Sequence, residues 1–120
     1  MKKKILIVDD EVALVFMFKE FLESKGYIVF HAPDGENALK LVKEIIPDII
    51  VLDIIMPKVD GFTVAKQIRY DEQLKNIPII VLSAQQEMKE LFAIEGIHDY
   101  LVKPVDQNVL LEMVRKRVGQ

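Results

Sequence analysis

The chain has 120 residues, a formal net charge of −3 at pH 7 and no cysteine, and 51% of its residues are hydrophobic. From this length we expect one domain with a hydrophobic core and no second, effector domain. The negative charge argues against nucleic acid as a direct partner. The lack of cysteine excludes disulfides, thiolate metal sites and a cysteine nucleophile.

We expect no export signal at the N-terminus. Met1 is followed by three lysines and an expected strand, rather than by the apolar region and small-residue cleavage site of a signal peptide. The longest purely apolar stretch, residues 12–18, is far too short to cross a bilayer. We therefore expect a soluble, cytoplasmic protein without membrane insertion.

Short apolar runs alternate with amphipathic stretches five times, which is typical of βα units wound into a parallel sheet. We expect an α/β fold, a doubly wound three-layer sandwich whose third and fourth strands are central because they are apolar almost throughout. The expected strands cover residues 4–8, 27–31, 48–53, 77–82 and 98–102. The expected helices cover residues 11–24, 35–45, 62–70, 86–94 and 106–118.

The first and third strands both end in aspartate. Asp9 and Asp10 follow the first apolar run, and Asp53 follows the third. The carboxyl ends of parallel strands meet at one edge of the sheet, so these acids can converge in space. Crowded carboxylates repel one another unless a cation lies among them, and an oxygen-only cluster suits Mg²⁺. The alternative is that each aspartate merely caps the following helix.

The first helix is apolar all round over residues 12–18. The residues that recur at helical spacing and should face the sheet are Leu14, Phe18, Phe21 and Leu22. This leaves Val12 and Phe16 on the side away from the sheet, and Val12, Val15 and Phe16 together should lie beside the acidic site. We hypothesise that they form a partner-binding patch; simple overpacking and a dimer through this helix are the alternatives.

The last two strands add polar groups at the same edge of the sheet. Ser83 follows the fourth strand, and Lys103 and Pro104 follow the fifth. Lys103 can place an ammonium group beside the acids, although a solvated lysine after an edge strand is the simpler interpretation. His31 and His98 have no partner at metal-ligand spacing, and we assign them no role.

Five motifs together resemble the receiver domain of bacterial two-component response regulators, over the full chain and nearly at the spacing of that family. The motifs are Ile-Val-Asp-Asp at 7–10, Leu-Asp-Ile-Ile-Met-Pro at 52–57, Asp60-Gly61, Val81-Leu82-Ser83-Ala84 and Tyr100-Leu101-Val102-Lys103-Pro104. The resemblance implies a flavodoxin-like (βα)5 fold with the strand order 2-1-3-4-5.

The resemblance also implies a site. Asp53 would accept a phosphoryl group from a phosphohistidine on a sensor histidine kinase or histidine phosphotransfer protein. Asp9 and Asp10, with Asp53 and the backbone carbonyl of Ile55, would hold Mg²⁺. Lys103 would pair with the phosphoryl group. These roles agree with the needs of phosphoryl transfer, which are an in-line nucleophile, a divalent cation and further positive or hydrogen-bonding groups.

Two further residues would form the family's switch. The hydroxyl of Ser83 would bond a phosphoryl oxygen, and the ring of Tyr100 would then move inward. A half-buried strand aromatic is the simpler interpretation of Tyr100. The resemblance also favours a cis bond between Lys103 and Pro104, since X-Pro bonds alone have an appreciable cis fraction.

One departure from the family lies between Ser83 and Lys103. Only 19 residues separate them, fewer than the family usually carries. We therefore expect the fourth helix or its flanking loop to be short, and we do not assume the family's usual dimer or output surface on that side.

We expect a single receiver domain over residues 1–120 with no effector domain. Its function would be a phosphorylation-dependent signalling switch that acts on a separate downstream protein, not a dedicated turnover enzyme. A phosphorylation-independent pseudo-receiver is the main alternative, but such a domain should have lost some of the site residues. A phosphatase of the haloacid dehalogenase type needs an acid where Ile55 stands. A nucleotide- or flavin-binding domain needs a glycine- or hydroxyl-rich loop after the first strand, but acidic residues stand there in this chain and would repel a phosphate.

Overall fold

The computed structural model describes residues 2–54 and 60–119, and these form a five-stranded parallel sheet in the order β2-β1-β3-β4-β5. The strands are β1 (Lys4–Val8), β2 (Ile28–Ala32), β3 (Ile49–Asp53), β4 (Ile79–Ser83) and β5 (Asp99–Val102). The helices are α1 (Val12–Ser24), α2 (Gly35–Ile45), α3 (Gly61–Arg69), α4 (Lys89–Ile94) and α5 (Gln107–Val118), and a 3-10 turn, η1 (Gln86–Met88), precedes α4. The predicted α/β class, strand order and elements are confirmed.

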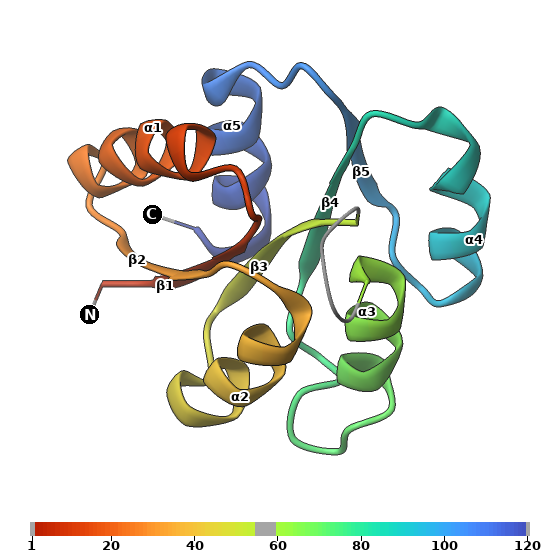
Figure 1. Ribbon diagram of the computed structural model, residues 1–120. Coiled ribbons are helices and arrows are strands. Elements are labelled where there is room, and N and C mark those ends of the chain that lie inside the picture. The colour runs from red at the N-terminus through yellow and green to blue at the C-terminus, as the bar shows by residue number, and fades with distance from the viewer. Residues whose placement is uncertain (1, 55–59, 120) are drawn as a thin grey trace.

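The sheet is the middle layer of three. Helices α1 and α5 cover one face, and α2, α3 and α4 cover the other (Figure 1). Alternate residues of β1 serve the two layers: Ile5 and Ile7 pack on the α1–α5 side, and Leu6 and Val8 pack on the α2–α3 side. Each fully buried aliphatic side chain of this kind contributes about 2 kcal/mol relative to an exposed one. This alternation therefore fixes which side of the sheet each helix covers.

The central position of β3 and β4 is confirmed, because all five residues of each strand are buried. Strands covered by helices on both faces read as continuous apolar runs. The two runs end in Asp53 and Ser83, which are themselves buried. The two buried central strands therefore place a carboxylate and a hydroxyl at the carboxyl edge of the sheet.

The N-terminus of α1 lacks the side-chain cap that three of the other helices have. Asp34, Asp60 and Asp106 cap α2, α3 and α5, each accepting a hydrogen bond from a backbone N–H in the first turn. Glu11 occupies the capping position of α1 but makes no side-chain hydrogen bond to that helix. The alternative that Asp9 or Asp10 caps α1 is therefore wrong.

The region after β4 is short, as the spacing predicts. The turn η1 has three residues and α4 has six, and Gly96 ends this region with a φ of 79°. Phe92 still reaches the core and is fully buried.

Among the described residues, no helix combines the length and the apolar character that a membrane span needs.

Candidate functional site

Three carboxylates meet at the carboxyl edge of the sheet. Asp9 and Asp10 follow β1, and Asp53 ends β3; one oxygen from each lies within 4.8 Å of the others. Asp9 and Asp53 are only 1% and 5% exposed, whereas Asp10 is exposed. The sequence-based convergence of these three residues is therefore confirmed. The cluster offers hard oxygen ligands, one of them open to solvent, which is the donor set that Mg²⁺ prefers.

Lys103 lies against this cluster. Its Nζ is 3.5 Å from an oxygen of Asp53, 3.7 Å from an oxygen of Asp9 and 3.3 Å from an oxygen of Glu11. Its backbone N–H donates to the carbonyl of Ser83 at 2.7 Å, which holds the residue at the end of β4. The bond between Lys103 and Pro104 is cis, as expected. The simpler interpretation of Lys103 as a solvated lysine is wrong, since its side chain is only 19% exposed.

The charges of the site perturb each other. Burial raises the pKa of Asp9, and this outweighs the hydrogen bond from the backbone N–H of Glu11 and the attraction of Lys103, both of which lower it. Burial alone would lower the pKa of Lys103, but the carboxylates of Asp9, Asp53 and Glu11 raise it above its ordinary value. The site therefore stabilises the charged form of Lys103, whereas the ionised form of Asp9 costs free energy in the folded protein.

Replacement of Asp9 by asparagine should stabilise the fold at neutral pH in the absence of Mg²⁺. A folded-state pKa above the unfolded value means that stability is lost as pH rises from about 3.8 through the folded pKa. We expect a gain of about 1 kcal/mol in the free energy of unfolding at pH 7, because the variant no longer has an ionised carboxylate at this buried position. Stabilising substitutions commonly have this size. Urea unfolding in a chelator at pH 7 and near pH 3 measures it. A gain of equal size at both pH values would contradict this origin.

The backbone around Asp53 is closely packed against the start of α3. The N–H of Gly61 donates to the carbonyl of Ile54 at 3.1 Å. A Cβ at position 61 would lie 2.5 Å from the carbonyl oxygen of Asp53 and closer still to the Cα of Ile54. Gly61 is therefore the residue type that this contact requires. The carbonyl of Ile55, the predicted fourth protein ligand, lies outside the described residues.

The two expected switch residues share a contact on the segment after β4. The hydroxyl of Ser83 accepts from the backbone N–H of Gln85 at 2.9 Å and lies 3.1 Å from its carbonyl oxygen. The phenol of Tyr100 donates to the same carbonyl. Tyr100 is 8% exposed, and its ring lies 6.0 Å from that of Phe92. Ser83 and Tyr100 are thus tied to one backbone group. Their coupling as a switch stays a prediction.

The first helix has one correction. Val12 and Phe16 are exposed, at 74% and 62%, as expected, but Val15 is only 4% exposed and packs in the core. The expectation that Val15 lies on the open side of α1 is wrong, because the helix turns Val15 inward beside Phe18. The residues predicted to face the sheet do so: Phe18 and Leu22 are buried, and Leu14 and Phe21 pack against the core.

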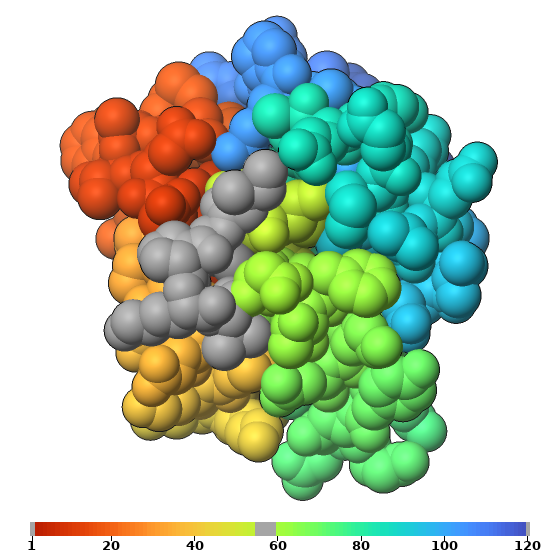
Figure 2. Space-filling model, turned by 45° about the vertical axis from the view of Figure 1, so that its right-hand side comes forward, coloured from red at the N-terminus to blue at the C-terminus, as the bar shows by residue number. Residues whose placement is uncertain are grey.

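A groove of about 410 Å³ runs between α1 and the segment after β5. Figure 2 shows the start of α1, in red, close to this segment, in blue, at one end of the molecule. The groove is mainly apolar, and Lys103 and Glu11 lie at its border with the acidic cluster. Its lining residues are Glu11, Leu14, Met17, Phe18, Leu82, Lys103, Pro104 and Val105. An apolar surface therefore adjoins the site.

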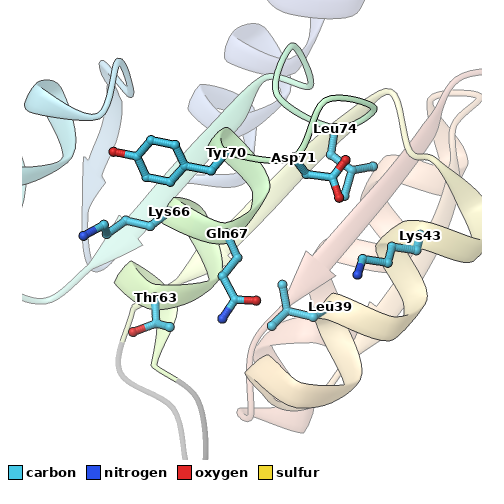
Figure 3. Close-up of a pocket in the computed structure, with 8 residues that line it drawn as sticks. All are labelled: Leu39, Lys43, Thr63, Lys66, Gln67, Tyr70, Asp71 and Leu74. Carbon is cyan, nitrogen blue, oxygen red and sulfur yellow. The ribbon is translucent and has the colours of Figure 1, made fainter.

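A larger groove, of about 600 Å³, lies between α2 and α3, away from the carboxylates (Figure 3). Leu39 and Lys43 come from α2, while Lys66 and Tyr70 extend from α3 away from α2. Tyr70 is 73% exposed. The groove is wide and solvated, and none of the residues with predicted chemistry lines it, so we assign it no function.

Three site residues were missed by sequence reasoning. Glu11 contacts Lys103, and its only signal was its place after the aspartate pair. Gln85 offers a backbone carbonyl, which no side-chain pattern reveals. His31, to which the sequence assigned no role, places Nε2 at 2.8 Å from the carbonyl oxygen of Asp9.

The chain is an α/β domain with a doubly wound sheet and acidic residues at the carboxyl edge of that sheet. Comparison with known proteins shows to which family such a domain belongs. The family model of the response regulator receiver domain matches residues 5–115. The chain therefore belongs to the receiver domain family of two-component response regulators.

Individual relatives of the chain are consistent with this family assignment. The alkaline phosphatase synthesis transcriptional regulatory protein PhoP of Bacillus subtilis is 45% identical over 87% of this chain, but the chain spans only 43% of that protein's length. A putative response regulator from Chloroflexus aurantiacus has a similar structure, with a TM-score of 0.93, 30% identity and full coverage of both chains.

The receiver domain of a sensor histidine kinase from Pseudomonas aeruginosa is also similar, with a TM-score of 0.88, 30% identity and full coverage of both chains. It is described with a magnesium ion coordinated in its active-site cleft. This chain has its own acidic cluster, formed by Asp9, Asp10 and Asp53 at the carboxyl edge of the sheet. These residues fit such an ion, since they supply oxygen ligands and a net negative charge.

Proposed function

We propose that this receiver domain is a phosphorylation-dependent switch that accepts a phosphoryl group on Asp53. The observation that carries the proposal is the contact of one largely enclosed ammonium, that of Lys103, with the buried carboxylates of Asp53 and Asp9. A buried nucleophile beside a fixed cation is the arrangement that stabilises charge on a transferring phosphoryl group.

The chain's residues would divide the chemistry among them. A carboxylate oxygen of Asp53 would attack the phosphorus of a phosphohistidine, forming an O–P bond while the N–P bond breaks and the electron pair returns to the imidazole. The ammonium of Lys103 would pair with a phosphoryl oxygen, and the hydroxyl of Ser83 would donate to another. Mg²⁺, held by Asp9, Asp10 and Asp53, would supply positive charge to the phosphoryl oxygens.

Replacement of Asp53 by asparagine should abolish phosphorylation. We expect the unchanged chain to gain one phosphoryl group from a small phosphodonor, only when Mg²⁺ is present, as measured by intact mass. Asp53→Asn keeps the shape of the side chain but removes the nucleophilic carboxylate. Asp71→Asn, the same change after α3, is the control and should be phosphorylated normally. An adduct that persists in Asp53→Asn, or that forms without Mg²⁺, would overturn the proposal.

We propose that the phosphodonor is a sensor histidine kinase or a histidine phosphotransfer protein, and that the output is contact with a separate protein. Val12 and Phe16 are exposed on α1, the helix whose other residues line one side of the apolar groove, and this supports docking of a helical donor next to Asp53. With Val15 in the core, the predicted patch consists of Val12 and Phe16, and Met17 (45% exposed) extends it.

Replacement of Phe16 by alanine should slow phosphotransfer from the cognate histidine protein by about tenfold, as loss of one well-packed aromatic contact does. Phosphorylation by a small phosphodonor should be unchanged, because Phe16 does not contact the carboxylates. Ile94→Ala, which removes a 79% exposed side chain on α4, is the matched control. An equal rate for Phe16→Ala and the unchanged chain with the protein donor would rule out the patch.

A phosphorylation-independent pseudo-receiver remains the alternative, and the mass measurement decides between the two. The cytoplasmic location, the lack of a dedicated enzyme activity and the lack of direct nucleic-acid binding stay predictions.

A further inference from the structure

His31 is bonded to the backbone of the acidic site. The backbone ladder between β1 and β2 runs to the pair Val8 and Ala32, and the N–H of Asp9 still donates to the carbonyl of Ala32 at 3.1 Å. Beyond that point β2 supplies a side chain: Nε2 of His31 lies 2.8 Å from the carbonyl oxygen of Asp9. A carbonyl only accepts, so this ring nitrogen carries the hydrogen and donates.

Asp9 is therefore held at three points. Its N–H is bonded to β2, its carbonyl is bonded to His31, and its carboxylate accepts from the N–H of Glu11 at 2.9 Å. Bonds on both sides of the Cα fix the rotation of the residue and the direction in which the chain leaves it. Asp10 follows directly, so its direction depends on the same bonds.

The residue type at position 31 suits this role. His31 pairs with Ile7 in the ladder and is partly buried, an environment that an apolar or β-branched residue would fill equally well. An imidazole adds a donor on a rigid side chain that reaches beyond the end of the strand. Buried polar groups are retained where they have partners, and here the partner is the backbone of a residue in the acidic cluster.

We propose that His31 is a positioning residue for the Mg²⁺ site: by donating to the carbonyl of Asp9, it holds the turn after β1 in the conformation that binds the ion. This inference rests on the proposed function of the acidic cluster. Outer-shell hydrogen bonds commonly change metal affinity by about 10–100-fold when removed. His31 bonds the backbone rather than a carboxylate, so we expect the lower part of that range, about 3–10-fold.

The test compares two variants at this position. His31→Phe keeps the ring and removes the donor, whereas His31→Gln changes the shape and keeps a donor. Mg²⁺ affinity is measured at 25 °C by NMR titration of backbone amide signals, with the amide of Glu11 as the local reporter because it donates to the carboxylate of Asp9. We expect about 3–10-fold weaker binding for His31→Phe and binding within about twofold of the unchanged chain for His31→Gln.

The control is Val29→Ala, which removes buried volume from β2 without touching the bond to Asp9. Its thermal stability should fall while its Mg²⁺ affinity stays unchanged. Unchanged affinity in His31→Phe would overturn the inference alone, and so would equal losses in His31→Phe, His31→Gln and Val29→Ala. If the unchanged chain binds no Mg²⁺ while Asp10→Asn behaves identically, both the inference and the proposed metal site fail.

Discussion

Replacement of Gly61 by alanine is expected to destabilise the fold by about 3 kcal/mol, at the upper end of ordinary overpacking. The added Cβ would meet the carbonyl oxygen of Asp53 and the Cα of Ile54, which are backbone atoms and cannot rotate away. Either the end of β3 or the start of α3 must shift. Urea unfolding measures the loss, and phosphorylation by a small phosphodonor should fall with it because Asp53 moves.

Gly96→Ala is the control for that substitution. Gly96 has a φ of 79°, and a Cβ there would meet nothing within 4 Å. Its replacement costs only the strain of a left-handed conformation, about 1 kcal/mol. If Gly61→Ala is no less stable than Gly96→Ala, the close contact with β3 does not constrain the chain as we infer.

Replacement of Lys103 by methionine is expected to have the second large effect. The change keeps most of the apolar stem but leaves the buried carboxylates of Asp9 and Asp53 without the ammonium that contacts both. Removing one partner of a buried pair costs about 3–5 kcal/mol, and we expect about 2 kcal/mol here because Lys103 retains some solvent contact. Phosphorylation should slow by about 100-fold with the loss of a cation at the phosphoryl oxygens.

Added Mg²⁺ should restore more stability to Lys103→Met than to the unchanged chain, because the ion would balance the same carboxylates. Lys75→Met is the matched control: Lys75 pairs with Glu72 at 3.0 Å on the surface, where an ion pair contributes roughly 0–1 kcal/mol. Equal stability of the two variants in a chelator would show that Lys103 does not balance the site.

The arrangement of the elements could be predicted from the sequence because each strand is a short apolar run and each helix follows it with a different period. The strand order came from the resemblance to a known family, since an apolar pattern does not say which strand lies beside which. The inward position of Val15 was missed although Val15 lies one turn before Phe18. Every residue from 12 to 18 is apolar, so polarity does not mark which of them are exposed, and only packing against the sheet shows it.

The candidate site was predictable where strand ends carry polar side chains, as with Asp9, Asp53, Ser83 and Lys103. Its supporting bonds were not, because they involve backbone groups or pairs far apart in the chain. The carbonyl of Gln85 receives Tyr100, and the carbonyl of Asp9 receives His31. Residue types alone do not reveal which carbonyl lies within reach of a side chain.

The position of Lys103 at the end of β5 has a consequence for biosynthesis. β5 is an edge strand that pairs with β4, and it is the last strand of the sheet in chain order. The ammonium that balances Asp9 and Asp53 therefore arrives only when the final strand has docked. A chain still emerging from the ribosome holds the acids but not their counter-charge. We therefore expect the site to be complete only after β5 has docked on β4, since Lys103 directly follows β5.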